Sequence, residues 1–357
     1  MILDKRLLIT ILAALLLVLL LVVAFCIPTA KPPAADPPPE TTQAALSRQE
    51  HTVGICLPAQ IDAWTATGAM LEKQLSDLGY RTEVVYSDGT AKAQNQLLLE
   101  LISKDVSCIV LAPVDSAAMA EADAAALKKN IPILSYGTLL MDTEAVAGYI
   151  CYDYQAMGAS VARYIEQTYT LATAQAEGRS YTAELFMGSP EDFNAVLLHK
   201  GIMGVLEPYL TSGVLDCKSH RTAFEDSCIY EWSENTAQAA CKGRLRSYPE
   251  SRPDILLCAS DSIAAGVIRA LEESGITAEN MPLVTGNGAT EAGMANLAAK
   301  KQALTVQTDP EEPAKACCAM VDRVLFGLEP EFALCDTFNN VKNIPTALCG
   351  YTLIEGE

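Results

Sequence analysis

The short apolar runs of this chain repeatedly end in an acid, an amide, a hydroxyl or an aromatic residue. Carboxylates and amides exchange hydrogen bonds with hydroxyl groups, and a flat indole or phenyl face covers an apolar CH surface. Neutral sugars are held by side chains of these kinds. The residues concerned are Gln60, Asp62, Trp64, Asp115, Ser116, Tyr136, Gly137, Thr138, Asp153, Tyr154, Asp192, Phe193, Asn194, Asp261, Ser262, Asn287, Thr308 and Asp309.

The same residues have a plainer interpretation. Asp, Asn and Ser after a strand are also the preferred N-caps of a following helix, and Asp115, Asp192 and Asp261 fit that role. Trp64 stands in a helical pattern and can be an ordinary core residue. Capping alone explains any single position, but it explains poorly the complete set, which forms two series that face each other.

Alternating strand and helix patterns must position these residues. From Thr52 onward, apolar runs such as "VSCIVLAPV" and "DILLCAS" alternate with longer helical patterns, and the alternation restarts after residue 153. Continuous apolar strands separated by helices predict parallel sheets, and two series predict an α/β fold of two doubly wound lobes. In such sheets, ligands bind beyond the carboxyl ends of the strands.

The N-terminus predicts attachment to a membrane. Residues 1–6 form a cytoplasmic n-region with Lys5 and Arg6, and an apolar run over 7–27 is long enough to span a bilayer. Two alternatives stay open, an uncleaved anchor and a lipoprotein signal lipidated at Cys26, where Phe25 stands in place of the usual Gly or Ala. Both place the rest of the chain outside a bacterial cell membrane, to which a proline-rich linker over 28–51 connects it.

Composition excludes several classes of function. Lys and Arg total 25 against 44 for Asp and Glu, so the net charge of −19 argues against a nucleic-acid partner. The three His residues and the Cys spacing fit neither a metal site nor a nucleophilic triad, so we expect no catalytic residues, no cofactor and no enzyme activity. The cysteines fall into two groups. Cys56, Cys108 and Cys258 lie in apolar strands, and Cys317 and Cys318 lie in a helix, so we expect these to be buried thiols. The candidates for disulfides are Cys217, Cys228, Cys241, Cys335 and Cys349.

Five segments together resemble the periplasmic sugar-binding proteins of ABC importers, and most of all their multiple-monosaccharide branch. They are "VGICLPAQIDAWTATG", "CIVLAPVDSAAM", "GSPEDFNAVLLHKGIMGVLEPYL", "CASDSIAAGVIRAL" and "LFGLEPE". The resemblance implies a type I binding fold whose two lobes close on a ligand, with three crossovers near 150–154, 286–289 and 307–309. The sugar-contacting positions it implies are Trp64, Asp115, Asp153, Asn194, Asp261, Asn287 and Thr308.

The chain departs from that family pattern at several contact positions. Gly137 and Thr138 replace an Asp-Arg pair, and Tyr154, Phe193 and Thr308 replace two Asn and a Lys. These changes remove two positive charges and an acid and add two aromatic rings. A ligand other than a hexopyranose bound in the usual way is therefore one hypothesis, and a degenerate site is another.

We accordingly predict a monomeric extracytoplasmic protein that binds a small polar ligand, a monosaccharide or sugar-like molecule, and delivers it to an ABC importer permease. The alternative is a membrane-tethered sensor that presents its closed state to a histidine kinase or similar receptor. The ligand-binding set is Trp64, Asp115, Tyr136, Asp153, Tyr154, Phe193, Asn194, Asp261, Asn287 and Thr308. The lobes are expected to comprise residues 52–152 with 288–307, and 153–287 with 308–357.

Overall fold

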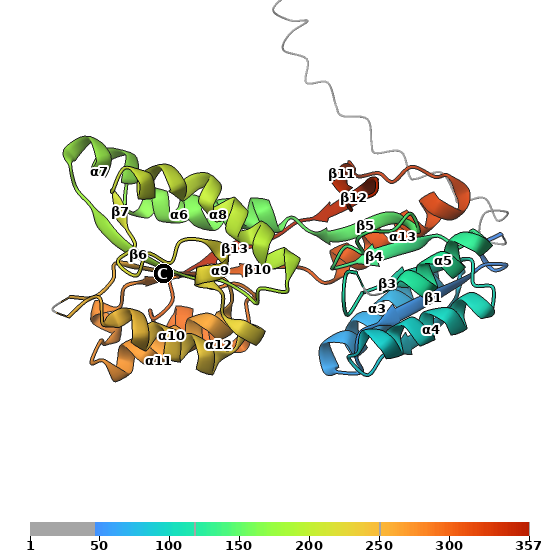
Figure 1. Cartoon of the computed structure of the whole chain (residues 1–357), viewed down its shortest axis with the longest axis horizontal. Coiled ribbons are helices and arrows are strands. Elements are labelled where there is room, and N and C mark those ends of the chain that lie inside the picture. Colours follow the sequence, from blue (N-terminus) through green and yellow to red (C-terminus); the bar gives the residue numbers. More distant parts are fainter. Residues whose placement is uncertain (1–46, 118, 250, 357) are drawn as a thin grey trace, which may run out of the picture. The chain divides into compact units, whose positions relative to one another are not determined.

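The structure is a computed structural model that describes residues 47–117, 119–249 and 251–356, and two main sheets organise that part of the chain (Figure 1). Within these ranges no helix is both long and apolar enough to cross a membrane. The predicted n-region, the apolar segment 7–27 with Cys26, and residues 28–46 of the predicted linker lie outside the described residues.

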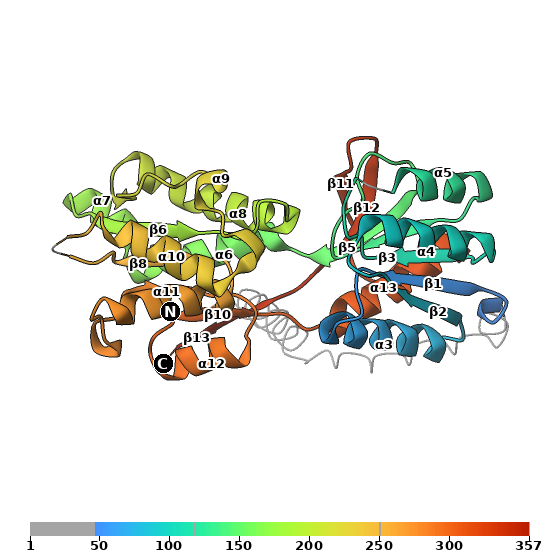
Figure 2. The same cartoon turned by 60° about the horizontal axis from the view of Figure 1, so that its bottom comes forward.

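A seven-stranded sheet forms the first lobe, in the order β11-β12-β5-β4-β3-β1-β2. All of its neighbouring strands are parallel except the antiparallel pair β11 and β12. Helices cover both faces, α4 and α5 on one and α3 and α13 on the other (Figure 2). The strands are β1 (Thr52–Leu57), β2 (Arg81–Tyr86), β3 (Cys108–Leu111), β4 (Ile133–Tyr136), β5 (Val146–Tyr152), β11 (Cys335–Phe338) and β12 (Asn343–Cys349), and the helices are α3 (Asp62–Asp77), α4 (Ala91–Ser103), α5 (Ala120–Lys129) and α13 (Glu311–Phe326).

A four-stranded parallel sheet in the order β7-β6-β8-β9 forms the second lobe. A bridge between Thr285 and Leu304 joins it to the antiparallel pair β10 and β13. The strands are β6 (Tyr181–Phe186), β7 (Leu215–Asp216), β8 (Ile255–Cys258), β9 (Leu283–Val284), β10 (Leu304–Gln307) and β13 (Thr352–Glu355). The helices are α6 (Tyr154–Thr168), α7 (Leu171–Glu177), α8 (Phe193–Thr211), α9 (Phe224–Ser227), α10 (Glu234–Leu245), α11 (Asp261–Glu273) and α12 (Glu291–Ala298), with 3-10 turns η1 (Tyr230–Trp232) and η2 (Ala278–Asn280).

The strand sequences explain the two-sided cores. β3 and β4 are buried at all four of their positions, as is β8 in the second lobe. A strand covered by helices on both faces has no solvent side, so it needs apolar residues throughout rather than in alternation. The doubly wound arrangement predicted from these runs is therefore the one observed.

The expected division of the chain between the lobes is wrong at its C-terminal end. Residues 291–307 form α12 and β10, which pack with the second lobe, whereas α13 and β12 belong to the first lobe, where β12 pairs with β5. Crossovers near 150–154 and 307–309 are present, but the third lies between Cys349 and Thr352, not at 286–289. The strands β11, β12 and β13 decide this, because they complete both sheets and the sequence patterns had not assigned them.

Residues 47–51, which the sequence places in the linker, pack on the first lobe. The guanidinium of Arg48 donates from Nε and Nη2 to both carboxylate oxygens of Asp322 on α13, at 3.0 and 2.7 Å. The ring of His51 meets that of Phe326 edge to face, with centroids 5.2 Å apart. The end of the predicted linker is thus part of the first lobe.

All eleven cysteines in the described part of the chain are free, including the five candidates for disulfides. Cys56, Cys108 and Cys258 are buried in β1, β3 and β8, as expected. Burial raises the pKa of the Cys56 and Cys108 thiols to about 12, so both are neutral and serve as small apolar groups. Cys317 and Cys318 are buried in α13.

Candidate functional site

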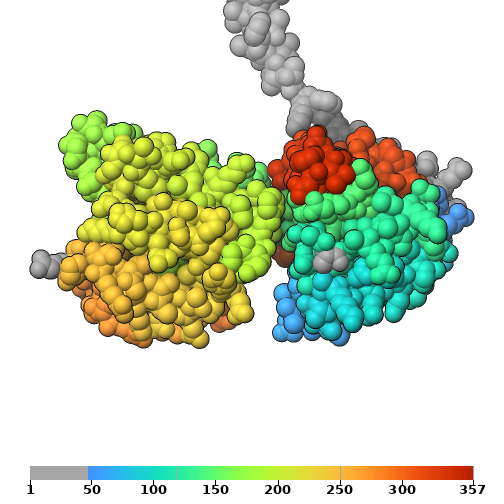
Figure 3. Space-filling model, in the orientation of Figure 1, coloured from blue at the N-terminus to red at the C-terminus, as the bar shows by residue number. Residues whose placement is uncertain are grey.

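A pocket of about 680 Å³ lies where the carboxyl-end loops of the two lobes meet. In the space-filling view the surface is hollowed between the blue-to-teal first lobe and the yellow-green part of the second (Figure 3). Its volume is in the range of small-molecule sites. The lining comprises Ala91, Pro113, Val114, Asp115, Ser116 and Thr138 from the first lobe, and Ser189, Glu191, Asp192 and Phe193 from the second.

The second-lobe wall is the start of α8. Asp192 is the N-cap of that helix, and its Oδ1 accepts from the backbone N–H of Asn194 at 2.9 Å. Burial raises the pKa of Asp192, while hydrogen bonds from the Asn194 and Ala195 backbone and from the Trp232 side chain oppose the rise. Phe193 follows as the first helical residue and stays 38% exposed within the pocket lining. Asp192 is therefore both a cap and a wall of the pocket.

Asn194 points toward the first lobe. Its Nδ2 donates to the carbonyl oxygen of Gly137 at 3.2 Å, and its Oδ1 is buried without a hydrogen-bond partner among the residues that the structure describes. The Gly137 carbonyl also accepts from the hydroxyl of Tyr149, at 3.0 Å. Gly137 has a positive φ of 77°, a conformation that favours glycine and turns this carbonyl out of β4. Asn194 thus links the two lobes by a direct hydrogen bond, and its Oδ1 is still able to accept one.

Two tyrosines form an aromatic pair at the first crossover. Tyr154, the first residue of α6, meets the ring of Tyr152 edge to face at 6.2 Å. Burial raises the pKa of Tyr154, and the nearby Asp192 charge raises it further, so its hydroxyl stays protonated. Tyr152 donates to the carbonyl of Asp309 at 3.1 Å. The first crossover and the 307–309 crossover therefore contact each other.

Trp232 is a candidate site residue that the sequence patterns missed. Its six-membered ring lies over Gly188, just past the end of β6, where an added Cβ would come within 2.2 Å of two ring carbons. Glu231 and Trp232 both have positive φ, 56° and 55°, and the Ser189 hydroxyl accepts from the Glu231 N–H at 3.1 Å. Trp232 is one of only two tryptophans in the sequence, and that rarity could have marked it as a candidate site residue. It stands, however, in a stretch without strand or helix periodicity.

The structure corrects the expected role of Asp261. Its side chain is 1% exposed, and both carboxylate oxygens are occupied from within the second lobe. Oδ2 accepts from the N–H and hydroxyl of Thr290, at 2.8 and 3.1 Å, and Oδ1 from Gln302 Nε2 and the Thr305 hydroxyl, at 2.9 and 2.7 Å. Four donors leave this carboxylate no free position for a ligand, so Asp261 is a structural residue.

The other candidates are spread around the pocket rather than in it. Asp153 caps α6, with Oδ1 accepting from Ala156 N–H at 2.9 Å, and faces a separate groove with Arg163 and Lys200. Asn287 Nδ2 lies 3.2 Å from Met157 Sδ, a weak acceptor. Trp64 packs half-buried on the first-lobe core, Tyr136 is 8% exposed, and Thr308 is half-buried at a crossover. Only Asp115 and Phe193 of the predicted set line the pocket itself.

Known proteins match the chain over nearly all of its described part. The family model described as "Periplasmic binding protein domain" matches residues 53–329. The multiple sugar-binding periplasmic protein SbpA of Azospirillum brasilense is 30% identical over 290 residues, 80% of each chain. The multiple sugar-binding periplasmic receptor ChvE of Rhizobium radiobacter is 28% identical, over 85% of this chain and 86% of that one.

A solved structure of a solute-binding protein is also similar to this chain. An ABC transporter solute-binding protein from Clostridium phytofermentans, solved with bound β-D-glucose, superposes with a TM-score of 0.76 at 31% identity. The match covers 85% of this chain and 94% of that one. Proteins of this family bind solutes and are not enzymes. The chain belongs to the periplasmic binding protein family and is an extracytoplasmic solute-binding protein.

Proposed function

We propose that the chain binds a monosaccharide or a sugar-like polyol in the 680 Å³ pocket and delivers it to an ABC importer permease. One observation carries the proposal: carboxylates and hydroxyls from both lobes line a single pocket. Asp115, Ser116 and Thr138 face it from the first lobe, and Ser189 and Glu191 from the second. Hydroxyl-rich ligands need acceptors and donors on several sides, and this lining supplies both.

The comparisons support a sugar as the ligand class. SbpA and ChvE are named as multiple sugar-binding proteins, and the Clostridium phytofermentans protein holds β-D-glucose. The lining here contains no Lys or Arg, whereas it does contain Asp115, Glu191 and Asp192. A neutral polyol is therefore a better fit than a carboxylated or phosphorylated sugar.

Ligand binding would favour closure through contacts that only the closed lobes make together. Asn194 does not line the pocket itself but follows Phe193, which does, and its buried Oδ1 is an acceptor that a ligand hydroxyl between the lobes could satisfy. Satisfying a buried acceptor is worth about 1–3 kcal/mol. In the open form the ligand contacts only one lobe, whereas in the closed form it contacts both. These additional contacts shift the population toward the closed form. The closed form is then the one that a permease would recognise.

A thermal-shift screen of monosaccharides and sugar alcohols on the full chain in detergent tests the proposal. We expect at least one neutral sugar to raise the melting temperature saturably. Asp115→Ala and Asn194→Ala should each weaken that response about tenfold or more, while Asp336→Ala, an exposed acid on β11, should leave it unchanged. A ligand whose affinity ignores both cleft changes would place the site elsewhere.

We further propose that the N-terminus tethers the protein to the outer face of the cell membrane, through the apolar segment 7–27 or a lipidated Cys26. Mass analysis of the mature chain separates the two forms. A mature chain that starts at Cys26 with added lipid supports transport by a lipoprotein. An intact Met1 favours the sensor alternative, because a permanent anchor suits a protein that signals to a membrane receptor.

A further inference from the structure

A second cavity of about 460 Å³ lies in the second lobe, and three cations line it. Lys218 and Arg221 come from the loop after β7, and Arg244 comes from α10. None of the residues that line this cavity lines the sugar pocket. In a chain with a net charge of −19, such a concentration of positive charge needs an explanation.

Arg244 is the buried member of the group. Its side chain is 7% exposed, and its guanidinium stacks on the ring of Phe186 at 4.0 Å. Among the described residues, its only hydrogen bond is from Nη1 to the carbonyl of Leu185. A guanidinium has five N–H donors, so most of those of Arg244 remain for a group that enters the cavity it lines.

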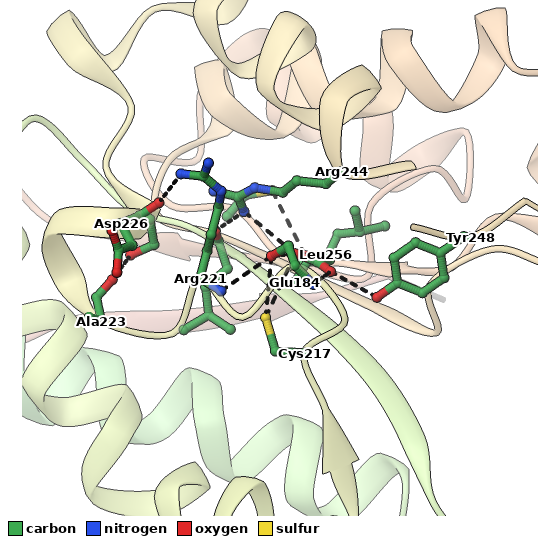
Figure 4. Close-up of polar contacts among 12 residues, drawn as sticks. Glu184, Cys217, Arg221, Ala223, Asp226, Arg244, Tyr248 and Leu256 are labelled. Atoms are coloured by element: carbon green, nitrogen blue, oxygen red, sulfur yellow. Dashed lines mark hydrogen bonds and ion pairs between the residues drawn. The ribbon is translucent and has the colours of Figure 1, made fainter. Parts of the chain in front are cut away.

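The acid nearest to Arg244 forms a buried ion pair with it but accepts no hydrogen bond from it. Glu184 Oε2 lies 3.9 Å from Arg244 Nη1, beyond hydrogen-bond distance. The Glu184 carboxylate is instead occupied by neutral donors: the Ser219 N–H at 3.1 Å and the Tyr248 hydroxyl at 2.9 Å on Oε1, and the Ser219 hydroxyl on Oε2. Figure 4 shows these contacts gathered around Glu184.

Arg221 contributes a second guanidinium to the lining of the same cavity. Its Nη1 donates to the backbone carbonyl of Asp226 at 3.2 Å, and the Arg221 and Arg244 side chains converge in Figure 4. Burial lowers the pKa of Arg244, the charge of Glu184 opposes that shift, and the charge of Arg221 adds to it, so the two guanidinium groups repel each other. The acid in the lining is Asp226, whose side chain is exposed. Lys218 adds a third charge while its ammonium lies 4.7 Å from the Tyr248 ring centre.

We propose that this cavity is an anion site for a phosphate-type oxyanion, with Arg221 and Arg244 as paired guanidinium donors and Lys218 as a point charge. Planar guanidinium groups match the oxygens of a tetrahedral oxyanion, and a lysine adds charge without fixing geometry. Ser219 and Ser247 supply hydroxyls to the same lining. The space exceeds that of a single tetrahedral ion, so both inorganic phosphate and a small phosphate ester have room.

The test is a titration of the full chain in detergent, followed by melting temperature at constant ionic strength. One arm uses inorganic phosphate, one uses glycerol 3-phosphate, and chloride provides the baseline. We expect a saturable rise in melting temperature in at least one phosphate arm, and the arm with the lower half-saturation concentration identifies free phosphate or its ester as the ligand. In Lys218→Gln/Arg221→Gln that concentration should rise about tenfold or more, since charged hydrogen bonds are lost.

Lys128→Gln/Lys300→Gln is the matched control, because it removes two charges from exposed sites on the two lobes. It should keep the wild-type phosphate response. Both double variants should also keep the sugar response, so failure of this site and failure of the sugar pocket are distinguishable. No phosphate-dependent rise in either arm, or an equal rise in wild type and Lys218→Gln/Arg221→Gln, overturns the proposal.

Discussion

The hydroxyl of Thr305 on β10 donates to Oδ1 of Asp261, the first residue of α11, over 2.7 Å. With Thr290 and Gln302 on the same carboxylate, this bond ties α11, the loop before α12 and β10 into one unit. It also helps to keep 291–307 with the second lobe, because separation would break these buried hydrogen bonds to the Asp261 carboxylate.

Replacement of Asp261 should therefore be a defect of folding rather than of ligand recognition. Asp261→Ala leaves the Thr290, Gln302 and Thr305 donors without their acceptor, and we expect a loss of about 3 kcal/mol in the free energy of unfolding. Urea denaturation followed by circular dichroism measures it. Asp115→Ala is the control and should change stability by less than about 0.5 kcal/mol. An unchanged midpoint for Asp261→Ala would contradict the structural role.

Two glycines set the distance between α6 and α8. A Cβ on Gly158 would lie 2.0 Å from the Leu198 carbonyl oxygen, and one on Gly201 would lie 1.9 Å from that of Gln155. Each obstacle is backbone, so the helices must separate to admit a methyl group. We expect Gly158→Ala and Gly201→Ala each to cost about 2 kcal/mol or more in stability.

Gly204 provides the control for that prediction, because it lies in α8 with Gly201 and no atom of the described residues lies within 4 Å of its added Cβ. Gly204→Ala should stabilise the protein by about 0.5–1 kcal/mol, since alanine favours a helix. Thermal unfolding of the three variants compares them directly. A similar effect at all three positions would refute the close helix contact.

Asp123 on α5 should make stability depend on pH. Its side chain is 6% exposed, its Oδ1 has no hydrogen-bond partner in the described part of the chain, and burial raises its pKa from 3.8 to about 6 despite the Thr143 side chain. The folded state therefore binds this proton more tightly than the unfolded chain does. The resulting stability is complete below about pH 4 and is lost as the pH rises through 6.

Asp123→Asn tests this dependence, because asparagine stays neutral at every pH. We expect the variant to gain up to about 3 kcal/mol over wild type at pH 7.5 and little at pH 4. Asp105→Asn, at an exposed acid, should show no such difference between the two pH values. Equal pH profiles for wild type and Asp123→Asn would show that this carboxyl does not titrate in the range.

The two tryptophans should report ligand binding separately. Trp232 lies over Gly188 beside the pocket wall, whereas Trp64 packs on the first-lobe core. We expect sugar binding to change the emission of Trp64→Phe, which retains Trp232, more than that of Trp232→Phe. Fluorescence titration with the best ligand of the screen measures both. A signal that depends on Trp64 alone would remove Trp232 from the site.

The sequence by itself determined the two doubly wound lobes, the buried cysteines of the central strands and the start of α8. These depend on local patterns: a strand covered on both faces must be apolar throughout, and Asp192 caps the helix that follows it in the chain. The same reasoning identified Asp115 and Phe193 as residues at a strand's carboxyl end, and both line the pocket.

Only the tertiary structure decided which polar side chains are fully hydrogen-bonded within the protein and which remain available to a ligand. Asp115 and Asp261 look alike in the sequence, since each is an acid just after an apolar strand. Asp261 meets donors from 29 to 44 residues away and is fully satisfied, whereas Asp115 accepts from the nearby Ala117 and stays exposed. The positions of Trp232 and of β12 likewise depend on partners distant in the chain, and no local pattern encodes those partners.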